Sequence, residues 1–71
     1  MHFRDFNAIA AELREGDTLR VELVSGGQLS GELTGQVKLG SPEQNGEISL
    51  LVAGDIRRLT AKELSELDLI Q

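Results

Sequence analysis

Arg57 and Arg58 are the residues of this chain whose type and spacing could do chemistry. They form its one basic cluster, in 71 residues that hold seven Lys and Arg, twelve Asp and Glu, and a net charge of −5. Guanidinium groups hold phosphate oxygens well, so the pair predicts contact with a polyanion. Successive strand residues point to opposite faces, so only one arginine can line a shared site. The open alternative is that both pair with carboxylates such as Asp55, Glu63 or Glu66.

Other kinds of site find little support in the composition. Cys is absent and His2, near the start, is the single histidine, which argues against disulfides, metal sites and a base for nucleophilic catalysis. Most carboxylates fall on expected solvent faces. We therefore predict no enzyme, no catalytic residue, no cofactor, no metal and no small-molecule substrate. Two Phe without Tyr or Trp make a base-stacking platform unexpected, and the acidic balance counts against broad phosphate contact.

The length predicts a single small domain over residues 1–71. Such a domain buries roughly 60% of the surface that the unfolded chain exposes, so its stability margin is thin. It commonly needs an additional stabilising feature such as a disulfide, a bound metal or oligomerisation. With disulfides and thiolate metal sites excluded and a histidine-based metal site not expected, oligomerisation is the stabilising feature left open. No window approaches 18 apolar residues and no basic segment precedes an apolar run. We therefore expect no membrane contact and a cytoplasmic protein.

The N-terminal segment predicts an amphipathic helix over residues 5–15. Its apolar residues recur at helical spacing: Phe6, Ile9, Ala10 and Leu13. Asp5 can cap the helix and Gly16 can end it. We expect the helix to cover one end of a small barrel; a free partner-binding helix is the alternative.

Period-two alternation then predicts two strands, in residues 17–25 and 28–37. A two-residue turn would place apolar against polar residues, so we predict a three-residue loop over 25–27. The opposed pairs would be Leu23 and Leu29, Val21 and Gly31, Leu19 and Leu33, Arg20 and Glu32, and Glu22 and Ser30. Gly31 and Gly35, both on the inner face, predict a tight bend of the second strand.

The rest of the chain predicts a loop, two strands and a helix. The loop covers residues 39–46, around the only proline. A strand follows over 47–53, with Leu51 outward, where it would suit a subunit contact if that strand were an edge. A short strand follows over 55–59. Thr60 and Glu63 then form a capping-box pattern, which predicts a C-terminal helix of about two turns.

The hairpin and the arginines resemble the Sm-like family, including its bacterial RNA-chaperone branch. The matching positions of the first family motif are Val21, Leu23, Gly26, Leu29, Gly31, Leu33 and Gly35. Ile56 and Arg57 are similar to the aliphatic-Arg step of the second motif, so the likeness spans about residues 5–59. The chain departs from the pattern at residues 36–38, where the family often has Asp, and at Arg58, where it has Gly. A helical signature also stands where the family expects its fifth strand.

The resemblance implies a mainly β fold, a small SH3-like or Sm-like bent β-barrel with an N-terminal helix and a short C-terminal helix. It implies a homo-oligomeric ring that binds single-stranded RNA or another polyanion, with Arg57 as the binding residue and Arg58 and Lys38 as further basic groups. The alternative is a non-catalytic assembly or protein-interaction module with no nucleic-acid role.

Overall fold

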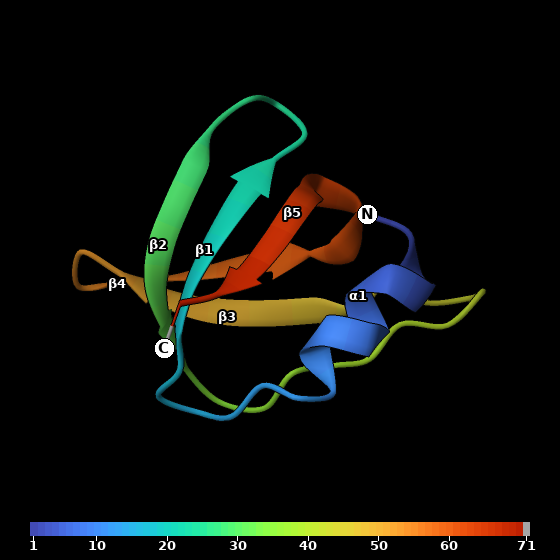
Figure 1. Cartoon of the computed structure of the whole chain (residues 1–71), viewed down its shortest axis with the longest axis horizontal. Coiled ribbons are helices and arrows are strands. Elements are labelled where there is room, and N and C mark those ends of the chain that lie inside the picture. Colours follow the sequence, from blue (N-terminus) through green and yellow to red (C-terminus); the bar gives the residue numbers. More distant parts are fainter. Residues whose placement is uncertain (71) are drawn as a thin grey trace.

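The computed structural model describes residues 1–70 and has one helix followed by a five-stranded antiparallel sheet (Figure 1). The elements are α1 Phe3–Ala10, β1 Thr18–Leu23, β2 Gln28–Leu33, β3 Glu47–Val52, β4 Asp55–Thr60, the 3-10 turn η1 Ala61–Glu63, and β5 Leu64–Leu69. The mainly β architecture with an N-terminal helix is therefore confirmed. No helix within the described residues has the length and apolar character needed to cross a membrane.

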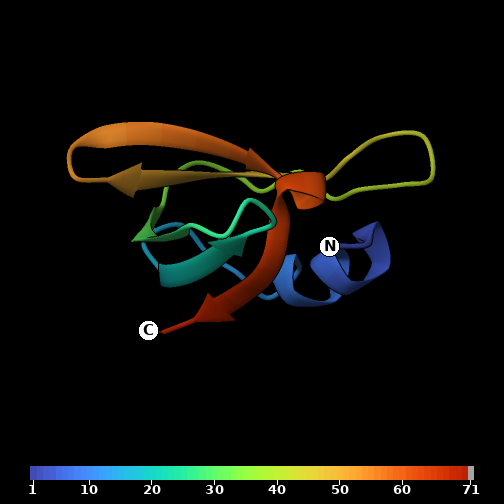
Figure 2. The same cartoon turned by 90° about the horizontal axis from the view of Figure 1, so that it is seen from above.

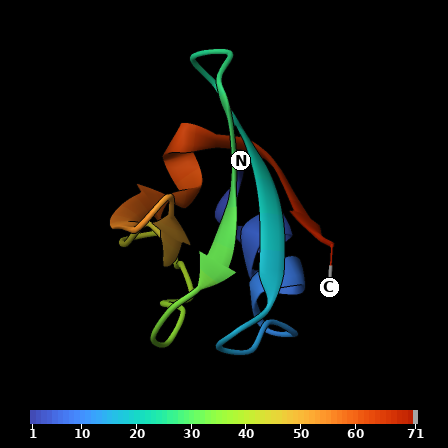
Figure 3. The same cartoon turned by 90° about the vertical axis from the view of Figure 1, so that its left-hand side faces the viewer.

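The sheet is bent, but it does not close into the barrel that the sequence predicted. Its strand order is β4-β3-β2-β1-β5, and β4 and β5 stay unpaired with each other in the described part of the chain. The β3–β4 hairpin forms one half of the fold, and β1, β2 and β5 form the other (Figures 2 and 3). β5 leaves η1 at a corner and pairs with β1, so β4 keeps a free edge.

The core fills the space between these halves and is covered at one end by α1. Its buried residues are Phe6, Ala10, Leu19, Val21, Leu33, Ile48, Leu50, Leu59, Ala61, Leu64 and Leu67. The apolar helix face is confirmed, but α1 begins two residues before Asp5 and ends at Ala10. The Nδ1 of His2, not Asp5, caps the helix by accepting a hydrogen bond from the Arg4 amide.

The β1–β2 hairpin has a three-residue loop, as predicted, but one residue earlier, over 24–26. Gly26 takes the left-handed conformation there, with φ 102°, and the Leu23 amide bonds to the Gly27 carbonyl. Leu19 consequently lies opposite Gly31 and Val21 opposite Leu29. The faces are as expected, but the predicted partners are wrong by two residues. The observed polar pairs are Arg20 with Ser30 and Glu22 with Gln28.

Gly31 is required by a crossing of two strands. β2 pairs with β1 up to Glu32 and then with β3 over two residues only, Glu32 with Leu51 and Leu33 with Leu50. A Cβ at Gly31 would overlap the Leu51 carbonyl oxygen. Gly35 has a different role, because β2 has already ended at Leu33 and Gly35 forms a left-handed turn with φ 72°.

β5 replaces the predicted C-terminal helix. The capping box is present, with the Thr60 backbone N–H donating to Glu63 Oε1 at 3.0 Å, but it closes only η1. Leu64 and Leu67 are both buried although they are three residues apart in a strand. The register of β1 and β5 shifts between Glu22 and Leu23, which leaves Ser65 as an extra residue, a β-bulge. The bulge thus produces a helix-like spacing within a strand.

The β2–β3 connection, which includes the predicted loop over 39–46, is fixed against α1. The Asn7 side chain donates to the Gly40 carbonyl at 2.8 Å and accepts from the Gly40 amide at 2.7 Å. Lys38 forms an isolated bridge with Glu47, so the loop leaves the sheet beside the start of β3.

Candidate functional site

β4 carries both arginines and places them on opposite faces. Arg57 lies opposite the buried Leu50, on the core side of the sheet, and Arg58 lies opposite Ser49. Both side chains are exposed. The geometry therefore separates the two guanidinium groups instead of building one paired site.

Lys38 shares a face with Arg58 and not with Arg57. Lys38 bridges to Glu47, and Glu47 lies opposite Thr60 on β4. Residues that lie opposite one another share a face of the sheet. We call the part of the sheet around β3 and β4 that is turned away from the core the outer face; it carries Glu32, Lys38, Glu47, Ser49, Leu51, Ile56, Arg58 and Thr60. Its two cations are thus accompanied by two carboxylates.

The salt-bridge alternative for the arginines is not realised within residues 1–70. The ion pair found there joins Arg20 to Asp68, at 3.8 Å across β1 and β5. Glu63, one of the expected partners, accepts hydrogen bonds from Thr60 instead, and these bonds lower its pKa. Both arginines on β4 therefore remain free to meet something other than the carboxylates of the described residues.

An exposed apolar pair sits beside the arginines on the outer face. Leu51 and Ile56 are cross-strand neighbours, 40% and 64% exposed. The sequence predicted an outward Leu51 on a possible edge strand, but β3 is internal and β4 is the edge. Sequence reasoning named Ile56 only as part of the motif with Arg57 and missed its exposure, although its place three residues before the inward Leu59 puts it on the outer face.

The opposite edge of the sheet, β5, is acidic. Glu66 lies directly opposite Glu22, and Asp68 lies opposite Arg20. A hydrogen bond and charge repulsion from Glu22 raise the pKa of Glu66, Asp68 raises it further, and Arg20 lowers it in part. The two free edges therefore differ in charge, with arginines on β4 and carboxylates on β5.

Glu66→Gln should stabilise the protein at neutral pH and not in acid. The pKa of Glu66 is raised by folding, so wild-type stability is full below the ordinary value of 4.5 and falls as pH rises through the raised value. The amide removes this repulsion. Thermal unfolding should show a Tm gain of a few degrees at most at pH 7 that closes below pH 4.5. Glu12→Gln, at an exposed carboxylate outside the cluster, is the control; an equal gain there would contradict the account.

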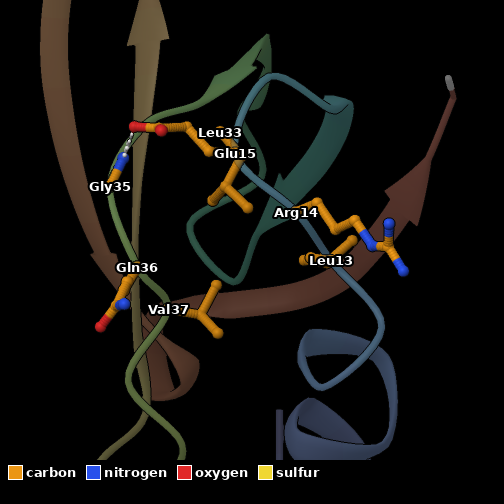
Figure 4. A pocket seen from close by; sticks show the side chains of 7 residues that line it. All are labelled: Leu13, Arg14, Glu15, Leu33, Gly35, Gln36 and Val37. Carbon is orange, nitrogen blue, oxygen red and sulfur yellow. Dashed lines mark hydrogen bonds between the residues drawn. The ribbon is translucent and has the colours of Figure 1, made fainter.

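A separate pocket of about 580 Å³ lies between the segment after α1 and the start of the β2–β3 connection (Figure 4). Leu13 and Val37 face each other across it, while Arg14 and Gln36 point outward on opposite sides. The Glu15 carboxylate at its rim accepts a hydrogen bond from the Gly35 amide at 2.9 Å. None of the three basic residues predicted from the sequence, Lys38, Arg57 and Arg58, lines this pocket.

The helix and the five-stranded antiparallel sheet are consistent with an Sm-like topology. Comparisons of the chain with protein-family models, with curated proteins and with solved structures found no match. The likeness to the Sm-like family thus rests on the motif residues and the strand order.

Proposed function

We propose that this chain is a non-catalytic assembly module that associates through a free edge of its sheet. The observation that carries the proposal is the edge of β4 that faces away from β3, which is unpaired within residues 1–70 and lies beside the exposed Leu51–Ile56 pair. A free edge presents unpaired backbone donors and acceptors to another strand, and an apolar patch beside it adds area that leaves water on contact. Oligomerisation would also add stability to a 71-residue chain that has no Cys with which to form a disulfide.

The distribution of charge supports this function above phosphate binding by a single chain. Arg57 lies on one face of β4 and Arg58 with Lys38 on the other, beside Glu32 and Glu47. A net charge of −5 argues against a broad basic surface. Because Phe6 is buried, the two Phe do not offer a pair of exposed rings for base stacking.

Sedimentation velocity over a concentration series tests this function. We expect a mass at least twice the 7.7 kDa of one chain at the upper concentrations. A mass of one chain throughout the series would contradict self-association.

The second candidate is an Sm-like ring that binds single-stranded RNA or another polyanion. Two observations favour it: Arg57 and Arg58 form no ion pair with the described residues, and the basic β4 and acidic β5 edges suit head-to-tail contact. Binding of a fluorescent oligoribonucleotide should then weaken as salt rises, and Arg58→Gln should reduce the salt dependence. Absence of binding at low salt would remove this candidate.

A further inference from the structure

The backbone of β4 is free for pairing at defined positions. β4 follows β3 through a two-residue loop in which Ala53 and Gly54 both have positive φ, 51° and 87°, as in a type I′ turn. The flanking pair Val52–Asp55 is then hydrogen-bonded, and such pairs alternate along the hairpin. Ile56 and Arg58 therefore direct their N–H and C=O groups away from β3. Thr60 follows the same alternation, and its N–H indeed bonds to Glu63 Oε1.

We propose that β4 pairs antiparallel with β4 of a second copy of this chain, about a twofold axis at Ile56. This rests on the assembly function proposed above and names the partner and the register. Ile56 of each copy lies opposite Ile56 of the other, and the two exchange both backbone hydrogen bonds. Asp55 of each copy then lies opposite Arg57 of the other, which makes two opposite-charge pairs on the core side.

Other registers of the same strand are disfavoured by charge. A twofold axis at Asp55 would oppose two carboxylates, and an axis at Arg57 or Arg58 would oppose two guanidinium groups. The Ile56 register also joins the exposed pairs of both copies into one apolar row on the outer face, Leu51, Ile56, Ile56, Leu51. Backbone alternation, charge and apolar surface thus select the same arrangement.

A charge-swap experiment tests this register. In the dimer of Arg57→Asp, both contacts between positions 55 and 57 join two carboxylates. In the dimer of Asp55→Arg, both of these contacts join two guanidinium groups. Each variant should weaken the dimer by roughly tenfold or more in sedimentation equilibrium. An equal mixture of the two variants should recover a dimer, because every such contact then joins opposite charges. Arg14→Asp, which makes the same change of net charge as Arg57→Asp but outside β4, is the control for that variant, and circular dichroism confirms that each variant is folded.

The outcomes separate the register from the function. Loss of the dimer in each variant with recovery in the mixture supports the pairing. Variants that keep the wild-type mass, whether of a dimer or a ring, overturn the register and leave self-assembly standing. A wild-type chain that stays a monomer overturns both.

Discussion

Gly31→Val should destabilise the protein by about 3 kcal/mol or more, at the upper end of the cost of overpacking. A Cβ at Gly31 would meet the carbonyl oxygen of Leu51, and it would lie 2.9 Å from Val52 Cγ2 and 3.0 Å from Leu51 C. The nearest atom is the backbone oxygen of Leu51, which cannot move without breaking the short β2–β3 ladder. Urea denaturation should show a lower midpoint, or a chain already unfolded in buffer.

Gly27→Ala is the matched control for this change. A Cβ at Gly27 meets only Leu23 Cδ1 at 3.6 Å, an ordinary van der Waals contact, so the variant should be within about 1 kcal/mol of wild type. Equal costs at Gly27 and Gly31 would mean that the strand crossing is not what requires Gly31.

Phe6→Ala should cost about 3–5 kcal/mol, as removal of a buried aromatic ring commonly does. Phe6 is fully buried where α1 meets the sheet. Its ring packs so closely on Gly46 that a Cβ at that position would overlap it. A chain of 71 residues has a total stability of roughly 4–11 kcal/mol, so much of the margin would be lost. Thermal unfolding by circular dichroism measures the change.

Phe3→Ala removes the same ring from a half-buried position of the same helix. It should cost clearly less than Phe6→Ala, because less apolar surface is lost from the core. Equal losses would show that α1 does not present Phe6 to the core in the manner described.

The alternation of apolar residues predicted most of the sheet. It placed β1, β3 and β4 and the inward direction of Ile48 and Leu50. The register of the first hairpin could not be derived, because the three-residue loop over 24–26 and one over 25–27 keep the same residues on the same faces.

β5 could not be recognised from the sequence pattern because it contains a β-bulge. Leu64 and Leu67 at a spacing of three, after a capping box, follow the pattern of a helix. In the structure Ser65 is the extra residue of the bulge, so both leucines reach the core from a strand. A periodicity argument assumes regular strands and therefore cannot detect such an insertion.

The candidate site was predicted in part. The sequence identified Arg57 and Arg58 and their opposite directions, but it could not show that β4 is a free edge or that Ile56 is exposed beside Leu51. Edge position depends on the order of strands in space, which local patterns do not determine.

Oxidative cross-linking of Ile56→Cys tests self-pairing of β4 most directly. The wild-type chain has no Cys, so the variant carries a single thiol. In the proposed register the two Cα atoms at position 56 are about 5.5 Å apart, within the range that a disulfide spans. In Arg58→Cys, the control, the thiols lie two residues on either side of the axis, about 13 Å apart along the strands. Pairing of β4 about Ile56 should give a covalent dimer for Ile56→Cys and a monomer for Arg58→Cys on a non-reducing gel. Equal cross-linking of both variants, or of neither, would rule this pairing out.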